Sequence, residues 1–278
     1  MTAAAAGFVS RLLCDLGCVP DFRPVEANLR AAMRLFSLVS PAGERRDMPG
    51  IAIVSTGLNH AMFNSAMLTA PVSGGHAELD RRLMIAKVHF DARGLRWSLW
   101  LCEDLLDRAA LRRAGAVCGA RGLRLVAELP GMLAEGLLAP RRPLPALEFR
   151  RVEDEQARLA FCSITSEAFN LPLETSHEIY GSEALWRDGY TGFVGYQEGE
   201  PITTAALLAA GGVAGIYSVA TSPRHRNRGC AEAVVRHAVE QARRQTGVER
   251  SVLQTSRFGR PLYERMGYRV VTGFSVYA

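Results

Sequence analysis

The sequence predicts an α+β protein of two domains, in which helices cover both faces of a sheet. Three observations support this prediction. Strand-like and helix-like segments alternate through residues 147–278, a similar alternation fills residues 26–129, and a proline-rich segment separates them. A length of 278 residues fits one large or two ordinary domains.

The segment 138–146 is the clearest linker in the chain. Its three prolines, at 140, 143 and 145, exclude a helix, because proline lacks an amide donor and has a fixed φ. We therefore expect an N-terminal domain at 1–140 and a C-terminal domain at 147–278.

The C-terminal domain has the clearer pattern of elements. We expect strands at 147–152, 191–196, 202–208, 215–220, 252–256 and 269–277, and helices at 154–169 and about 175–186. A long amphipathic helix begins inside the loop before Glu232, and a short one carries Tyr263. The N-terminal half echoes this order. It has predicted helices at 26–39, 77–91 and 106–116, and predicted strands at 51–55, 63–69, 97–102 and 123–129.

The most informative stretch is 217–232, where a strand leads through a basic loop into a helix. The first amides of a helix lack partners, and the helix dipole adds positive charge there. Gly229 has no Cβ and allows an anion to approach closely, Ala231 is small, and Arg226 and Arg228 supply charge. The pattern predicts a pyrophosphate site. A solvated helix N-terminus is the alternative.

Two motifs in this order resemble the GNAT superfamily of N-acetyltransferases. Residues 226–231 read R-x-x-G-x-A, and Tyr263 precedes Gly267 by four residues, just before the final strand. The resemblance implies a mixed, mostly antiparallel sheet flanked by helices. It also implies transfer of an acetyl group from acetyl-CoA to a primary amine by direct attack. The echo in residues 1–140 resembles a second, degenerate GNAT-like domain, so the tandem form of the family is expected.

The resemblance also assigns roles to individual residues. Tyr263 matches the family's general acid or thiolate stabiliser, and a phenol of pKa ~10 is protonated at neutral pH. Backbone groups of Val219, Ala220 and Thr221 are expected to pair with the pantetheine arm. The residues expected to complete the cofactor site are Arg226, Asn227, Arg228, Gly229, Cys230, Ala231 and Ser256. Ser256 stands where the family often has asparagine. Packing in the core is the alternative role for Val219 and Tyr263.

The N-terminal domain is expected to be non-catalytic. Its turn at Gly74 and Gly75 lacks flanking arginines, and the helix beginning near Arg108 has no tyrosine matching Tyr263. A plain α/β domain without shared ancestry is the alternative. The general base stays unassigned, since Glu178 and Glu183 are better explained as solvated residues of a helix face.

Composition narrows the cellular setting and the partners. The net charge of +5 and pI near 9.0 suit an anionic co-substrate, and no nucleic-acid motif accompanies them. No apolar run approaches ~18 residues and no leader is recognisable, so we expect a cytoplasmic protein without membrane contact. Of six cysteines only Cys14 and Cys18 are close together, which predicts free thiols and no metal site. The sequence is compatible with a homodimer and does not decide the oligomeric state.

Two other functions stay open beside the acetyltransferase. One is a CoA-binding sensor or scaffold with the same fold and no turnover. The other is an acyltransferase that uses a longer acyl-CoA. The acceptor, a small molecule or an amino terminus, is not readable from the sequence, because variable loops around residues 169–173 build its pocket.

Overall fold

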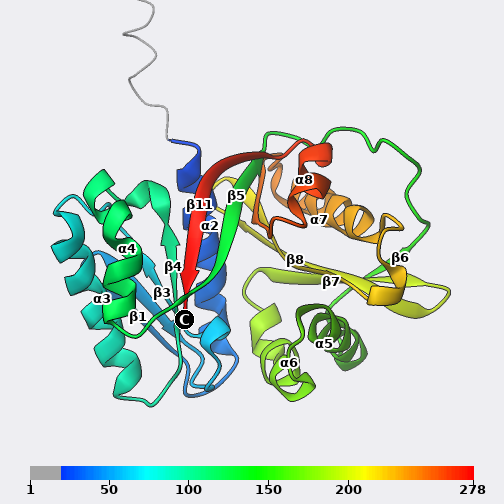
Figure 1. The fold of residues 1–278 in the computed structure, drawn as a ribbon. Helices are drawn as coiled ribbons and strands as arrows, with labels where there is room; N and C mark the ends of the chain where they lie inside the picture. Colours follow the sequence, from blue (N-terminus) through cyan, green and yellow to red (C-terminus); the bar gives the residue numbers. More distant parts are fainter. Residues whose placement is uncertain (1–19) are drawn as a thin grey trace, which may run out of the picture.

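The computed structural model describes residues 20–278 (Figure 1). Cys14, Cys18 and the rest of residues 1–19 lie outside the described residues. The N-terminal half contains α2 (Phe22–Leu35), β1 (Glu44–Met48), β2 (Ile51–Ser55), β3 (Ser65–Leu68), α3 (Gly75–Asp91), β4 (Ser98–Cys102), α4 (Arg108–Ala120) and β5 (Leu125–Ala134). The C-terminal half contains β6 (Glu148–Arg151), α5 (Glu155–Phe169), α6 (Leu173–Tyr180), β7 (Tyr190–Gln197), β8 (Glu200–Ala210), β9 (Val213–Thr221), α7 (Cys230–Thr246), β10 (Ser251–Gln254), α8 (Arg260–Met266) and β11 (Arg269–Tyr277).

The eleven described strands form one sheet that runs through both halves. Their order is β1-β2-β3-β4-β11-β5-β10-β9-β8-β7-β6, which is symmetric about the pair β11–β5 except for the additional edge strand β6. The pairs β3–β4 and β9–β10 are parallel, and every other described pair is antiparallel. The prediction of an α+β fold with a mixed, mostly antiparallel sheet is confirmed.

Each half supplies a strand to the other half's part of the sheet. β11 lies beside β4 of the N-terminal half, with Phe274 opposite Cys102. β5 lies beside β10 of the C-terminal half, with Ser251 opposite Ala134. The two exchanged strands also pair with each other over most of their length. The halves are therefore joined by main-chain hydrogen bonds as well as by the linker.

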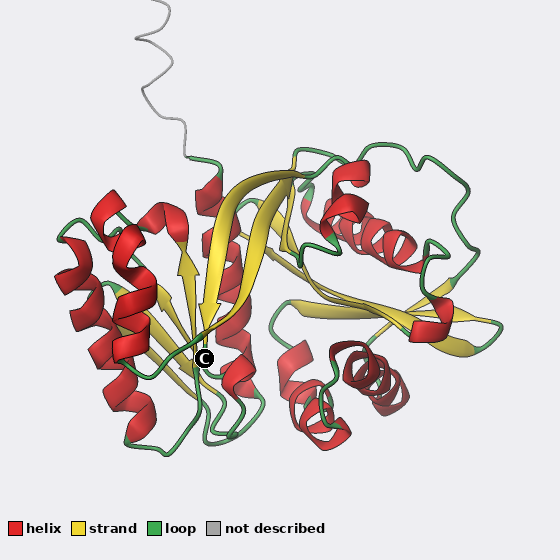
Figure 2. Ribbon diagram, in the orientation of Figure 1, coloured by secondary structure: helices red, strands yellow, loops and turns green. Residues whose placement is uncertain are grey.

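The helices cover the sheet in groups (Figure 2). α3 and α4 pack together beside the N-terminal strands, while α5 and α6 lie on one side of β7–β9 and α7 and α8 on the other (Figure 1). α2 fills the space between the halves and packs on β5, β8, β9 and β10. Its buried face carries Val25, Leu29, Ala32 and Met33 at the spacing of an amphipathic helix.

Most predicted elements are confirmed within a few residues, with two corrections. α6 ends at Tyr180, because Gly181 interrupts it and only a 3-10 turn at Glu183–Trp186 follows. β1 was not predicted, because its sequence ERRDM is charged and mostly exposed at the sheet edge. With β1 included, α2 to β5 repeats the order of α6 to β11: one helix, three strands, then helix, strand, helix, strand.

The predicted linker has a structural counterpart. Residues 138–147 form no helix or strand, as their prolines predict. They pass beside the loop before α7, where Pro145 lies close to Gly229. None of the helices within residues 20–278 has the length and apolar character required to span a bilayer.

Candidate active site

A wedge between two parallel strands forms the base of the site. β9 and β10 pair only where Ala214 faces Ser251 and Gly215 faces Val252. Beyond this point the two strands diverge. A bulge at Ser218, which has a φ of 48°, shifts the register of β9 against β8. The edge of β9 that faces away from β8 therefore has no strand partner after Gly215 and is open to an extended ligand.

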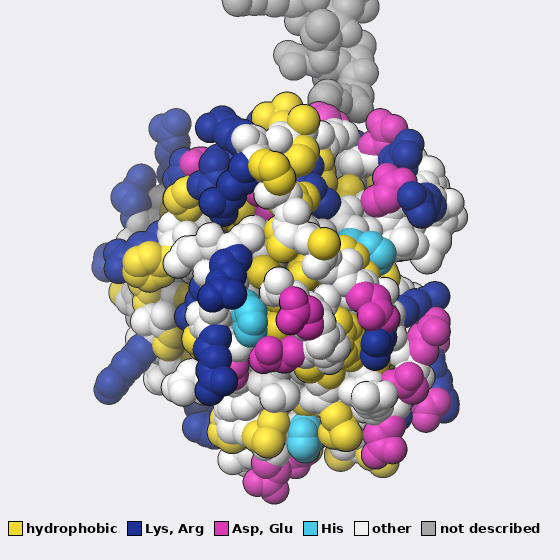
Figure 3. Space-filling view, turned by 90° about the vertical axis from the view of Figure 1, so that its right-hand side faces the viewer, with side chains coloured by type: hydrophobic (Ala, Val, Ile, Leu, Met, Phe, Trp, Pro, Cys, Tyr) yellow, Lys and Arg dark blue, Asp and Glu magenta, His cyan; other side chains and the backbone are white. Residues whose placement is uncertain are grey.

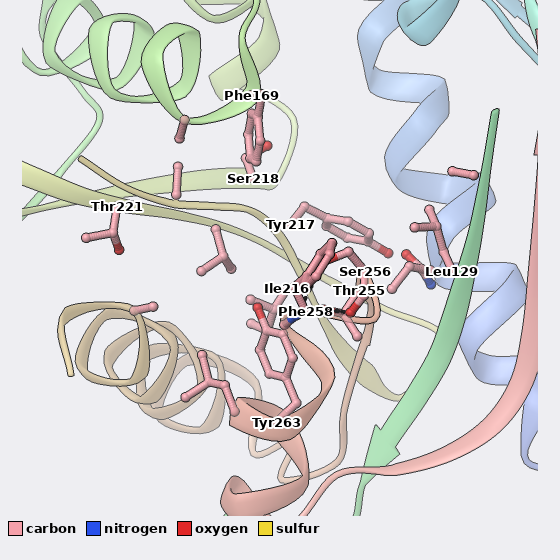
Figure 4. A pocket seen from close by; sticks show the side chains of 18 of the residues that line it. Leu129, Phe169, Ile216, Tyr217, Ser218, Thr221, Thr255, Ser256, Phe258 and Tyr263 are labelled. Atoms are coloured by element: carbon pink, nitrogen blue, oxygen red, sulfur yellow. Dashed lines mark hydrogen bonds between the residues drawn. The ribbon is translucent and has the colours of Figure 1, made fainter. Parts of the chain in front are cut away.

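The wedge opens into a pocket of about 1190 Å³ whose walls come from both halves. Figure 4 shows Ser218 and Thr221 along β9, Ser256 and Phe258 on the loop before α8, and Leu129 of β5 across the pocket. The pocket continues from the loop before α7 to the buried face of α2.

The pocket brings together nearly all residues that the sequence predicted for the site. Its lining includes Val219, Ala220, Thr221, Arg226, Asn227, Gly229, Cys230, Ala231, Ser256 and Tyr263. Arg228 is exposed and lies outside this lining, so a direct contact of its side chain with a ligand gains no support from the pocket. Figure 3 shows acidic and basic side chains side by side over the face that lies on the right-hand side of Figure 1, with hydrophobic side chains between them.

Gly229 begins α7 in a conformation that favours glycine. Its φ is +87°, and a Cβ there would lie 3.3 Å from Cδ of Pro145. No side chain caps the helix, so its first amides are available to an anion. Arg226 is held over the loop by a hydrogen bond from Nε to the Thr221 carbonyl oxygen, at 3.2 Å. The loop thus combines free amides, a positive helix end and a guanidinium.

Tyr263 extends from α8 into the pocket (Figure 4). Its ring is only 7% exposed and meets the ring of Tyr268 edge-on, with centroids 5.7 Å apart. Burial raises the pKa of the Tyr263 phenol above its usual value. The phenol therefore stays protonated at neutral pH and can donate a proton or a hydrogen bond.

Cys230 is a poor candidate for a nucleophile. A helix N-terminus tends to lower the pKa of a thiol, but here burial has the larger effect and raises the pKa of Cys230. Burial also raises the pKa of Cys102, Cys118 and Cys162, which are free thiols and buried like Cys230. Among residues 20–278, no group of three or more His, Cys, Asp or Glu side chains is placed to hold a metal ion.

The linker contributes two arginines that sequence reasoning did not assign to the site. Arg142 approaches the Asn227 carbonyl oxygen at 3.5 Å. A second hollow of about 320 Å³ beside the loop is lined by Arg141, Arg142, Glu232 and Arg265. The Arg-Arg pair between prolines is visible in the sequence, but its place beside Asn227 depends on the path of the linker.

Asn28 and Tyr217 form a polar contact between the halves that also went unpredicted. The Tyr217 hydroxyl donates to Oδ1 of Asn28 at 2.5 Å. Nδ2 of Asn28 donates to the carbonyl oxygens of Leu208, Ala210 and Val213, at 3.0 to 3.4 Å. This places α2 against the bulged part of β9, so the N-terminal half forms part of the pocket wall.

The equivalent loop of the N-terminal half is occupied by the protein's own carboxylates. The amides of Ser73 and Gly74 donate to Oε2 of Glu78 at 3.0 and 2.6 Å, and the amide of Gly75 donates to Oδ2 of Asp107 at 3.0 Å. The bond from Gly74 is the largest cause that lowers the pKa of Glu78, so this carboxyl is ionised. An external anion would have to displace both side chains.

The acidic residues considered as a general base lie away from the pocket lining. Glu178 is exposed on α6, and Glu183 pairs with Arg187 at 2.5 Å. Neither lines the pocket, and the base stays unassigned.

Comparison with known proteins agrees with this geometry. The Acetyltransferase (GNAT) family profile matches residues 158–268. A GCN5-related N-acetyltransferase from Kribbella flavida is 20% identical in sequence, covers 90% of this chain and 94% of its own, and superposes with a TM-score of 0.67. No curated protein matches the sequence significantly.

Two further solved structures share the fold across both halves. A functionally unknown conserved protein from Staphylococcus epidermidis is 12% identical, covers 85% of this chain and 93% of its own, and has a TM-score of 0.60. A GCN5-related N-acetyltransferase from Sphaerobacter thermophilus is 21% identical, covers 82% of this chain and 76% of its own, and has a TM-score of 0.53. The wedge, the glycine loop and the profile match lead to one conclusion: the C-terminal half of this chain carries a domain of the GNAT acetyltransferase family.

Proposed function

We propose that this protein is an acetyl-CoA-dependent N-acetyltransferase that transfers the acetyl group directly to a primary amine of a small molecule or an amino terminus. The observation that carries the proposal is that the wedge, the glycine loop and Tyr263 line one continuous pocket. The acetyltransferase class rests on the GNAT family match, and the residue roles below are part of the proposal.

The chain's own groups supply three functions. The N-terminus of α7 and Arg226 hold the pyrophosphate, and the open edge of β9 at Val219 to Thr221 pairs with the pantetheine arm. A backbone amide near Val219 polarises the thioester carbonyl. Ser256 accepts a bond from the Gly259 amide at 3.3 Å and keeps its own hydroxyl hydrogen for the pantetheine.

Tyr263 completes the transfer as the proton donor. The neutral amine attacks the carbonyl carbon, the carbon–sulfur bond breaks, and the departing sulfur takes the phenol proton, which solvent then restores. The amine nitrogen loses its extra proton to water or to an unassigned base. Burial keeps the phenol protonated, so its hydroxyl is present as a hydrogen-bond donor to the sulfur as negative charge develops there.

We also propose that each chain binds one CoA and that the N-terminal half is a degenerate GNAT-like domain. The order of α2 to β5 supports shared architecture, and the carboxylates of Glu78 and Asp107 at its loop argue against a second CoA. This half is then structural and shapes the acceptor side of the pocket.

The test measures binding and turnover together. Calorimetry with CoA is expected to give one site per chain. Incubation with acetyl-CoA and a panel of primary amines is expected to give an acetylated product by mass spectrometry. CoA binding with no product from any amine would favour the sensor or scaffold. Faster turnover with octanoyl-CoA than with acetyl-CoA would favour the longer acyl donor.

A further inference from the structure

One part of the pocket is an apolar chamber between the two halves. Its walls are Met33 of α2, Phe36 just after that helix, Phe63, Trp100 of β4, and Tyr180 and Tyr190 of the C-terminal half. Four of these rings are packed together, with Phe36 edge-on to Tyr180 and Tyr190 at centroid distances of 6.3 and 6.0 Å, and Phe63 close to Phe36 and Tyr180. We call this region the aromatic chamber.

We propose that the aromatic chamber binds the body of the acceptor, and that the acceptor is a monoamine with an apolar, aromatic-sized body. The inference rests on the proposed function, because it names the substrate class of that same pocket. Three observations support it: the distribution of charged side chains in the pocket lining, the apolar side chains at the pocket mouth, and the buried hydroxyl of Tyr190.

The charge of the pocket is confined to one end. The charged side chains in the lining are those of Arg142, Arg226, Glu232 and Arg265, and all of them belong to the linker, the loop, α7 or α8. The residues that α2, β4 and β5 contribute carry no charged side chain. A polyamine or an aminoglycoside would bring several ammonium groups into this apolar space, where the lining residues of α2, β4 and β5 offer no acidic side chain to pair them, which is costly.

The rim of the pocket is apolar as well. Met62, Val126, Phe169 and Phe258 all line it, although they are 43%, 60%, 40% and 80% exposed. Large apolar side chains that gather at a pocket mouth mark a binding site for apolar groups. A hydrophilic acceptor would leave this rim without a partner.

Tyr190 gives the chamber a polar contact for the amine. Its hydroxyl is buried and has no hydrogen-bond partner among the described residues, although buried hydroxyls are normally paired. The Tyr190 ring lies 6.3 Å from that of Tyr217, which precedes the bulge at Ser218. The hydroxyl is therefore an unpaired polar atom behind the chamber wall, and it becomes available as a hydrogen-bond acceptor for the amine only when a neighbouring side chain moves aside.

The first experiment compares acceptors on the protein saturated with CoA or acetyl-CoA. We expect 2-phenylethylamine and tryptamine to bind in calorimetry, and to be acetylated with kcat/KM about tenfold or more above spermidine and kanamycin. Preference for the polycations would overturn the aromatic chamber while the acetyltransferase stands. Binding of the aromatic amines without acetylation would support the chamber and contradict the proposed activity. Neither binding nor acetylation of them would overturn the inference.

The second experiment adds a charge to the rim. Met62→Glu places a carboxylate at the pocket mouth, and Met48→Glu is the matched control, because Met48 is 40% exposed on β1 and does not line the pocket. We expect Met62→Glu to lower kcat/KM for 2-phenylethylamine about fivefold or more and to raise it for spermidine. The control should change neither. Equal behaviour of the two variants would count against the chamber.

Tyr190→Phe tests the polar contact separately. The variant keeps the ring and removes the hydroxyl, so the KM for the amine should rise severalfold while the KM for acetyl-CoA and the melting temperature stay unchanged. An unchanged amine KM would remove Tyr190 from the acceptor site.

Discussion

The Tyr217 hydroxyl lies 2.5 Å from Oδ1 of Asn28, and this hydrogen bond ties α2 of the N-terminal half to the strand that borders the proposed thioester site. The two residues are 189 positions apart in the chain. Burial raises the pKa of Tyr217, so the phenol is protonated and can donate at neutral pH.

Asn28→Ala is expected to destabilise the protein by about 1–3 kcal/mol, because it leaves the Tyr217 hydroxyl without its acceptor and removes the amide that three carbonyl oxygens share as a donor. Tyr217→Phe removes a single bond and should cost about 1 kcal/mol. Urea unfolding measures both. An Asn28→Ala variant as stable as the parent would show that water replaces the carboxamide.

Gly229→Val should abolish measurable CoA binding, because the added side chain approaches Pro145 and covers the amides of α7. Gly247→Val is the matched control. Gly247 ends the same helix with a φ of +72° and has open space around it, so it carries similar backbone strain far from the loop. Calorimetry should show normal CoA affinity for the control. Unchanged affinity in Gly229→Val would refute the loop assignment.

The double variant Arg141→Gln, Arg142→Gln should weaken CoA binding about three- to thirtyfold and flatten its salt dependence, because the linker then brings less positive charge to the loop. Arg112→Gln, Arg113→Gln removes an equal charge from exposed positions on α4 and serves as the control. Titrations at two salt concentrations distinguish the pairs. Matching effects of the two variants would mean that only net charge matters.

Tyr263→Phe should lower kcat about ten- to a thousandfold with little change in the KM for acetyl-CoA, because the hydroxyl acts only as the sulfur departs. Tyr268→Phe is the control, since its buried hydroxyl bonds to Oγ of Ser251 at 2.7 Å. That variant should lose about 1 kcal/mol of stability and keep its kcat. Equal losses of binding and rate in Tyr263→Phe would indicate that the phenol anchors the co-substrate.

The buried thiols predict a loss of stability at alkaline pH. Burial raises the pKa of Cys102 and Cys162 to about 11 and that of Cys118 to about 12. Above pH ~9 the unfolded chain loses these protons and the folded chain keeps them, so the free energy of unfolding falls as pH rises. This stability is fully present below pH ~9.

Each thiol should contribute a loss of roughly 1 kcal/mol between pH 8 and pH 10. Urea unfolding at the two pH values measures the difference. Cys118→Ala should reduce the decline by one thiol's share. An identical decline in the variant would mean that other groups cause it.

The sequence predicted the local parts of the fold and of the site. The spacing of apolar residues located α5 within one residue, and Gly229 marked the start of α7 because only glycine adopts its conformation without strain. Tyr263 was found from its spacing to Gly267. These features are local, so a short window of sequence contains the information.

Features that depend on distant contacts were not readable. β1 exists because its main chain pairs with β2, and its charged side chains carry no alternating pattern. Asn28 looks like any polar residue of an amphipathic helix until β9 is placed against it. The alternation of apolar and polar residues in a strand does not show which strand it pairs with. The exchange of β5 and β11 between the halves therefore could not be predicted from the sequence.

That exchange determines when the protein can fold during synthesis. β4 pairs with β3 on one edge, but its other edge gains its partner only when β11 has been synthesised, and β11 follows every other described element in the chain. The N-terminal half must therefore wait, with an open strand edge, for a segment more than 160 residues downstream, between Cys102 and Arg269. The sheet of the first half therefore cannot be completed before the second half has been synthesised, and until then the edge of β4 is exposed to pairing with other chains.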